Sequence, residues 1–164
     1  MKINNINYKL VRAMSKQSFV NYCQQVGFND NNIDDKNVAI IEILDSSYSH
    51  YNLPYYNGYN TAVFKNEHPN VLIQVFDDTE KESDSVKVIE NDQAQYIFDF
   101  INNNIDKKKF IVHCSAGISR SGAVATFIYE YLRFLNYDVR FIDRNVVRPN
   151  QEVLRKLHNI LNNY

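Results

Sequence analysis

Cysteine is scarce in this sequence of 164 residues, and neither sign of charge is in clear excess. The two cysteines, Cys23 and Cys114, are too few for a disulfide framework, so a reducing compartment is expected. The 18 Lys and Arg residues nearly balance the 19 Asp and Glu residues, which gives a formal net charge of −1. Proteins that bind nucleic acid or an anionic membrane usually carry a basic excess, so we expect neither as a partner.

Long apolar runs are also absent. The sequence never approaches the run of about eighteen apolar residues that a membrane-spanning helix needs, and its N-terminal segment lacks the apolar core of a signal peptide. We therefore expect a cytoplasmic protein. His50, His68 and His158 do not have the spacing to cysteines or carboxylates that is typical of a metal site, so neither a metal ion nor another cofactor is expected.

Strand-like and helix-like segments alternate along the chain. Apolar runs predict four strands, the second and third of them buried: Tyr8–Ala13, Asn37–Leu44, Asn70–Phe76 and Lys109–Val112. Apolar residues at helical spacing predict four helices, the first between an N-cap at Ser15 and a stop at Gly27: residues 15–26, 91–105, 119–135 and 151–162. This order predicts a single α/β domain over residues 1–164, with a central, mostly parallel sheet flanked by helices.

In a parallel sheet of this kind, the ligand site lies beyond the carboxyl ends of the strands. Cys114 follows one predicted strand, and the pair Asp77 and Asp78 follows another. The pattern therefore places a thiol and two carboxyl groups at the same edge of the sheet.

The segment HCSAGISRSG, residues 113–122, has the composition of a phosphate-binding loop. Small side chains and a glycine let the loop curl, so that successive backbone N–H groups point inward and bind an anion. The helix predicted from Ser119 adds the N–H groups of its first turn and the positive end of its dipole. Arg120 adds a planar guanidinium that can donate to two phosphate oxygens. This positive environment favours the thiolate of Cys114, which is a nucleophile for phosphorus.

This loop resembles the signature loop of the cysteine-dependent protein tyrosine phosphatase superfamily, in particular its small dual-specificity branch. The resemblance implies that family's fold and a reaction through a cysteinyl-phosphate intermediate, with Cys114 as the nucleophile and Arg120 on the transition state. It implies that His113 orders the loop and that Ser121 stabilises the departing thiolate. It also implies that the phosphate oxygens are held, together with Arg120, by the loop residues Ser115, Ala116, Gly117, Ile118 and Ser119.

A carboxylic acid is also needed, because the leaving alkoxide or phenolate must take a proton. The resemblance implies that an aspartate from a loop before the cysteine supplies this proton. Asp78 stands 36 residues before Cys114, and its spacing from Phe76 matches the family's Phe-x-Asp pattern. We expect Asp78 to be the general acid, with Asp77 as the alternative, and the other aspartate to lie in a solvated acidic turn.

Two further features have both a functional and a structural interpretation. The segment Arg148-Pro149-Asn150 resembles the turn before the last helix of dual-specificity phosphatases, and we expect Asn150 mainly to cap that helix. The tyrosine-rich stretch Tyr48–Tyr59 is either a wall against a phosphotyrosine substrate or a loop packed on the edge of the sheet.

Several other functions use a similar loop. Phosphoinositide phosphatases of the superfamily often carry lysine within it, whereas this loop has none, which favours a phosphorylated protein as the substrate. An RNA 5′-phosphatase of the same fold fits the near-neutral charge poorly. A rhodanese-like sulfurtransferase normally lacks the Gly-x-x-Arg-Ser ending. Pseudophosphatases usually have lost the cysteine, the arginine or the acid, and all three are present here. We expect a monomeric protein phosphatase.

Overall fold

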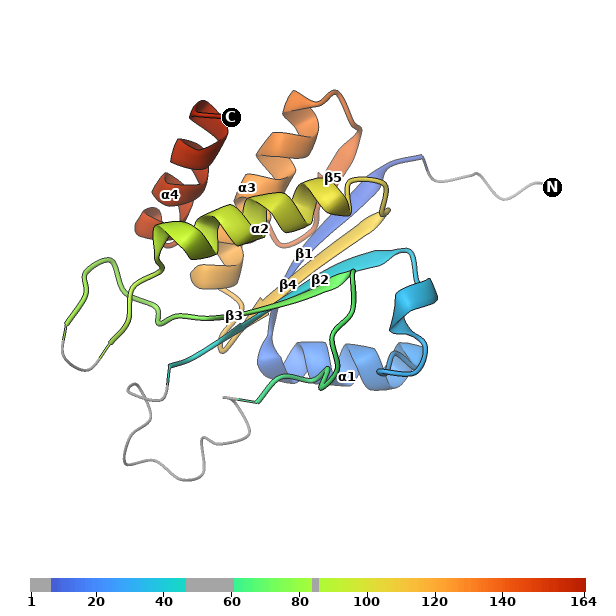
Figure 1. Ribbon diagram of the computed structural model, residues 1–164. Helices are drawn as coiled ribbons and strands as arrows, with labels where there is room; N and C mark the ends of the chain where they lie inside the picture. The colour runs from blue at the N-terminus through green and yellow to red at the C-terminus, as the bar shows by residue number, and fades with distance from the viewer. Residues whose placement is uncertain (1–6, 47–60, 84–85) are drawn as a thin grey trace.

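The computed structural model describes residues 7–46, 61–83 and 86–164. Within these ranges the chain forms a five-stranded sheet in the order β3-β2-β4-β1-β5, and every neighbouring pair of strands is parallel (Figure 1). The strands are β1 (Lys9–Ser15), β2 (Val38–Leu44), β3 (Val71–Val75), β4 (Lys109–Cys114) and β5 (Val139–Phe141). The helices are α1 (Lys16–Val26), the short 3-10 helix η1 (Ile33–Asp35), α2 (Asn91–Asn103), α3 (Arg120–Phe134) and α4 (Gln151–Asn162).

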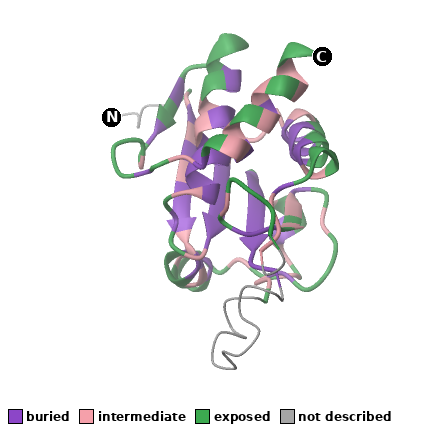
Figure 2. Cartoon of the chain, turned by 90° about the vertical axis from the view of Figure 1, so that its left-hand side faces the viewer, coloured by how far each residue is buried: buried purple, intermediate pink, exposed green. Residues whose placement is uncertain are grey.

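Helices cover both faces of the sheet. The helices α2, α3 and α4 lie together on one face, and α1 lies on the other face with η1 (Figure 1). Phe98 and Phe127 belong to the larger core under the three helices, and Phe19 and Phe64 belong to the smaller core under α1. Figure 2 shows the central strands buried between these layers; α1, α2 and α4 are buried mainly along one side, whereas the first half of α3 is buried on all sides. The predicted α/β fold, with a parallel sheet flanked by helices, is confirmed.

The helix ends follow the sequence closely. Ser15 caps α1 by accepting a hydrogen bond from the Ser18 N–H at 3.1 Å, and Gly27 ends the helix in the left-handed conformation. Asn150 caps α4 with its side-chain oxygen, as predicted. Among the described residues, no helix has both the length and the apolar character that crossing a membrane requires.

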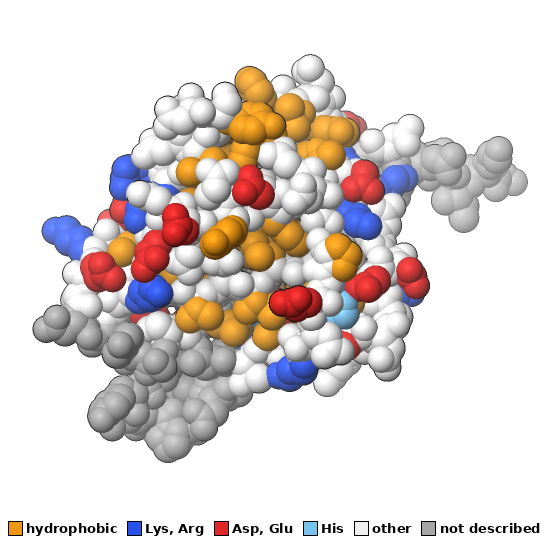
Figure 3. Space-filling view, in the orientation of Figure 1, with side chains coloured by type: hydrophobic (Ala, Val, Ile, Leu, Met, Phe, Trp, Pro, Cys, Tyr) orange, Lys and Arg blue, Asp and Glu red, His pale blue; other side chains and the backbone are white. Residues whose placement is uncertain are grey.

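Strand β3 differs from its prediction. A strand buried on both faces was expected, but β3 lies at the edge of the sheet, where Ile73 and Val75 are 37% and 40% exposed. Hydrophobic side chains accordingly reach the surface on the face of the molecule shown in Figure 3. A short apolar run does not reveal whether a strand is central or at an edge. Strand β5 was not predicted, because three residues are too few to show a periodic pattern.

The parallel register collects the polar strand ends at one edge of the sheet. Cys114, the last residue of β4, pairs with Ser15 at the end of β1, and His113 pairs with Glu42 of β2. Strand β3 ends at Val75, just before the two aspartates. The candidate site is therefore assembled by the sheet itself.

Candidate active site

A tight loop leads from Cys114 at the end of β4 to Arg120, the first residue of α3. Cys114 is only 2% exposed and lies at the base of this loop. Two groups contact its sulfur: the Gly117 backbone N–H donates to Sγ at 3.3 Å, and the Ser121 hydroxyl lies 3.1 Å from Sγ. Both groups can donate to a negatively charged sulfur.

Gly117 lets the loop fold against the sheet. Its φ is +76°, and a Cβ atom at this position would lie 2.4 Å from the Ser15 nitrogen and 2.5 Å from the Met14 carbonyl carbon. Only glycine fits, because both the backbone conformation and the available space exclude a side chain. The Lys16 N–H also donates to the Ser115 carbonyl at 3.3 Å, which joins the loop to the start of α1.

Helix α3 begins without a side-chain cap. Ser119 occupies the N-cap position, but its hydroxyl makes no capping bond and donates instead to Asp78 Oδ1 at 2.7 Å. Within the described chain, the first turn of α3 thus has no capping side chain to accept from its N–H groups. These groups and the positive end of the helix dipole suit an anion such as phosphate.

Arg120 is buried, and three oxygens hold its guanidinium. Nη1 lies 2.6 Å from Asp45 Oδ1 and donates to the Phe76 carbonyl at 2.8 Å, and Nη2 donates to Ser115 Oγ at 3.1 Å. Ser115 in turn donates to Asp45 Oδ2 at 2.9 Å. The buried Nε–H of Arg120 has no hydrogen-bond partner among the described residues. A buried donor left unpaired is unfavourable, and an oxygen of a bound phosphate would satisfy it.

His113 lies in the core behind the loop. Its Nε2 lies 2.8 Å from Glu42 Oε1, both side chains are buried, and the imidazole stacks on Phe19 with 4.5 Å between ring centroids. The Glu42 carboxylate also accepts from the backbone N–H groups of Val63 at 2.8 Å and Phe64 at 3.1 Å. From this position His113 supports the loop from behind and does not face solvent.

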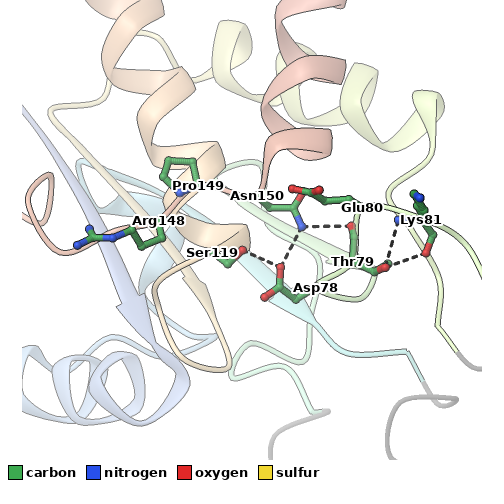
Figure 4. Close-up of a pocket in the computed structure, with 8 residues that line it drawn as sticks. All are labelled: Asp78, Thr79, Glu80, Lys81, Ser119, Arg148, Pro149 and Asn150. Carbon is green, nitrogen blue, oxygen red and sulfur yellow. Dashed lines mark hydrogen bonds between the residues drawn. The ribbon is translucent and has the colours of Figure 1, made fainter.

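Asp78, on the segment after β3, meets the loop at its rim (Figure 4). Its Oδ1 accepts hydrogen bonds from Ser119 Oγ at 2.7 Å and from Asn150 Nδ2 at 2.9 Å. Asp78 is exposed, and its Oδ2 has no hydrogen bond to any described residue. A pocket of about 510 Å³ opens beside these three side chains and is lined also by Arg148. The structure thus brings Asp78 to the loop that carries Cys114.

Asp77 has different surroundings. Its carboxylate is buried and, among the described residues, accepts hydrogen bonds from the Ser46 backbone N–H at 2.9 Å, the Ser46 hydroxyl at 2.6 Å and the Lys87 N–H at 2.6 Å. Asp77 therefore joins the end of β2 to the segment before α2. The sequence predicted a solvated turn for one of the two aspartates, and Asp77 does not lie in one.

The remaining features of the sequence lie outside the loop. Cys23 packs in the core under α1, and burial, with a smaller contribution from Glu42, raises the pKa of its thiol to about 12. In residues 7–46, 61–83 and 86–164, no group of three His, Cys, Asp or Glu side chains could hold a metal ion. The stretch Tyr48–Tyr59 and His50 fall outside the described residues.

The sequence interpretation missed two carboxylates, Glu42 and Asp45. Glu42 belongs to the otherwise apolar run Asn37–Leu44, which was predicted to be a buried strand, and Asp45 follows that run directly. A carboxylate in a buried strand requires a partner, since an unpaired charge there is strongly unfavourable. The partners are the two positively chargeable residues of the motif, His113 and Arg120.

No protein-family model matches the chain, and neither does any curated protein. Among solved structures, it is similar to the human tyrosine phosphatase-like serine/threonine/tyrosine-interacting protein, with a TM-score of 0.48, 17% identity, and coverage of 93% of this chain and 87% of the other. It is also similar to Tk-PTP in the active form, with a TM-score of 0.46, 16% identity, and coverage of 98% and 95%.

Proposed function

We propose that this protein is a phosphatase that hydrolyses phosphomonoesters of proteins through a cysteinyl-phosphate intermediate. One observation carries the proposal: the buried Cys114 sulfur lies in a loop that ends in the uncapped first turn of α3, where the buried Arg120 Nε–H has no partner among the described residues. Phosphate matches this arrangement in charge and in number of oxygens.

In the first step, the Cys114 thiolate attacks phosphorus, and an S–P bond forms as the P–O bond to the leaving group breaks. Protonated Asp78 gives its proton to the leaving oxygen. Arg120 and the loop N–H groups stabilise the charge that spreads over the three equatorial oxygens.

In the second step, the Asp78 carboxylate takes a proton from a water molecule, and the water oxygen attacks phosphorus. The S–P bond breaks, inorganic phosphate is released, and the thiolate is restored. The Ser121 hydroxyl, 3.1 Å from Sγ, is placed to donate to the sulfur as negative charge returns to it.

The choice of Asp78 as the acid is supported by the surroundings of the two aspartates. Asp78 is exposed at the rim of the loop and keeps one carboxylate oxygen without a described partner, as a proton donor requires. Asp77 is buried and uses both of its oxygens to hold backbone and hydroxyl groups.

The loop interior carries no lysine, which favours a phosphoprotein over an inositide as the substrate. We place phosphotyrosine first and phosphoserine or phosphothreonine second. The protein is proposed to act as a monomer in the cytoplasm, where thiols stay reduced, since an oxidised Cys114 could not attack phosphorus.

Hydrolysis of p-nitrophenyl phosphate by the wild-type protein and by Cys114→Ser tests the proposal. Turnover should be readily measured for the wild type and should fall by at least about a thousandfold in the variant, because the nucleophile is lost. A wild-type protein without turnover would refute the phosphatase function. Equal turnover by both proteins would refute Cys114 as the nucleophile.

The variants Asp78→Asn and Asp77→Asn test which of the two aspartates is the general acid. We expect Asp78→Asn to lower kcat about a hundredfold or more and to remove the decline of turnover at alkaline pH that reflects loss of the acid's proton. We expect Asp77→Asn chiefly to lower the melting temperature, since it weakens a buried hydrogen-bonding centre. The reverse pattern would make Asp77 the general acid.

A further inference from the structure

The Asn150 side chain forms hydrogen bonds both to α4 and to the segment that carries Asp78. Its Oδ1 accepts from the Glu152 and Val153 N–H groups, at 3.0 Å each, and so caps α4. Its Nδ2 donates to Asp78 Oδ1 at 2.9 Å and to the Thr79 carbonyl at 3.1 Å (Figure 4). The side chain is buried, and these contacts use both acceptor sites and both donors of its amide.

These partners fix the orientation of the amide. The Glu152 and Val153 N–H groups can only donate, so the amide oxygen must face α4. The NH₂ group must then face Asp78, and a rotation of the amide by half a turn would leave donors opposed to donors. Asp78 Oδ1 thus faces a group that can only donate.

A protonated carboxyl group carries its proton on one oxygen. Because the Asn150 amide N–H cannot accept a hydrogen bond, a proton on Asp78 Oδ1 would oppose it. The proton of the acid is therefore directed to Oδ2, the exposed oxygen that has no partner among the described residues. Ser119 adds a second donor to Oδ1.

We propose that Asn150 is a positioning residue for the general acid: it holds Oδ1 of Asp78 as an acceptor, so that Oδ2 carries the proton toward the leaving group. The inference rests on the proposed function. Asn150 is itself fixed to the loop, because its backbone N–H donates to the Ser119 carbonyl at 3.0 Å. The positions of the acid, Asp78, and of the nucleophile, Cys114, are thus both fixed relative to the loop that leads from Cys114 to Arg120.

Capping alone does not require asparagine at this position. Serine and aspartate cap helices about as well, but neither has an amide N–H to give to Asp78. The variants Asn150→Ser and Asn150→Asp therefore keep the cap of α4 and remove the donor. Glu152→Gln is the matched control, because it alters the same first turn of α4 without contacting Asp78.

The measurement is kcat/KM for two substrates, phenyl phosphate and p-nitrophenyl phosphate. Phenol is the poorer leaving group and depends more on the general acid. We expect the ratio of kcat/KM for phenyl phosphate to that for p-nitrophenyl phosphate to fall about tenfold or more in both Asn150 variants, and to stay within about twofold of wild type in Glu152→Gln. A loss that came only from weaker folding would lower both rates equally and leave the ratio unchanged.

Two further measurements complete the test. The rate at which iodoacetamide alkylates Cys114 should be unchanged in the Asn150 variants, because the nucleophile is not affected. In an Asp78→Asn background, Asn150→Ser should cause no further fall in the ratio, since the two residues act as one unit.

The outcomes separate the two proposals. If the wild type is active and both Asn150 variants keep its ratio of rates, the positioning role is refuted and the phosphatase function stands. If the wild type hydrolyses neither substrate, the proposed function is refuted, and the role of Asn150 with it.

Discussion

Two glycines of this chain have nearly the same backbone conformation but very different surroundings. Gly27 has a φ of +78° and ends α1 with nothing near its missing side chain, whereas Gly117 has a φ of +76° and touches the backbone of β1. The difference allows the effect of backbone strain to be distinguished from the effect of the close approach of the Cys114–Arg120 loop to the sheet.

We predict that Gly27→Ala destabilises the protein by about 1 kcal/mol, the cost of a left-handed alanine, and leaves turnover intact. Gly117→Ala should lower stability by about 2 kcal/mol or more, and should also abolish turnover, because the loop must move away from Ser15. Urea unfolding and p-nitrophenyl phosphate hydrolysis measure the two effects. Equal effects from the two substitutions would contradict the packing described for the loop.

The residues that contact the phosphate in the proposed mechanism could be predicted from the sequence, because they lie within one contiguous motif. Their supporting partners could not be assigned, since Glu42 and Asp45 are some seventy residues away in sequence and reach the motif only through strand pairing. The contact of Asn150 with Asp78 could not be predicted either, because only the capping of α4 by Asn150 is a local interaction.

At the scale of elements, His68 joins two segments on the α1 side of the sheet. Its Nε2 and Nδ1 each lie 2.6 Å from a carboxylate oxygen, the first from Asp30 and the second from Asp34. The hydrogen bond to Asp30 is the largest cause of a raised pKa for His68, and the same bond holds the pKa of Asp30 below its ordinary value. Asp30 also accepts from the N–H groups of Lys65 and Asn66.

The direction of these shifts fixes the pH dependence of stability. The pKa of His68 is higher in the folded state than in the unfolded state. The stabilisation of the fold by His68 is therefore complete below about pH 6.5, the ordinary histidine pKa, and is lost as the pH rises through the raised pKa. The pKa of Asp30 is lowered in the folded state. The stabilisation of the fold by Asp30 is therefore complete above the ordinary aspartate pKa and is lost as the pH falls through the lowered pKa.

We therefore predict that His68→Gln lowers the melting temperature more at about pH 5.5 than at about pH 9. The control is His158→Gln, which removes a histidine from an exposed pair with Glu130. Thermal unfolding of the three proteins at both pH values measures the effect. If His68→Gln lowered the melting temperature equally at both pH values, a charged His68 between two carboxylates would be contradicted.

The elements themselves were largely predictable, because helical spacing and apolar runs are local properties. The observed ends of α1 and α4 lie within one residue of the predicted ends. Helix α3 is one residue shorter than predicted at each end, because Ser119 and Leu135 are its cap residues. The edge position of β3 and the existence of β5 depend on which strands pair, and no local pattern carries that information.

At the scale of the whole molecule, the net charge of −1 and the proposed function fit together. Both acidic and basic side chains lie on the face shown in Figure 3. In the proposed mechanism the phosphate binds where β4 ends and α3 begins, at backbone N–H groups and the buried Arg120 guanidinium, which do not contribute to a basic surface. Such a protein would recognise a phosphate group that can enter the loop and would have little general affinity for polyanions.

The proposed mechanism requires that Cys114 becomes covalently phosphorylated during turnover. The most direct measurement is mass spectrometry of the Asp78→Asn protein after brief reaction with p-nitrophenyl phosphate and quenching in acid. With this good leaving group the first step needs little acid catalysis, whereas hydrolysis of the intermediate lacks its base, so the intermediate should accumulate. We predict one added phosphoryl group on the peptide that contains Cys114, and none in the protein that also carries Cys114→Ser. Turnover with the phosphoryl group on any other residue would contradict the account.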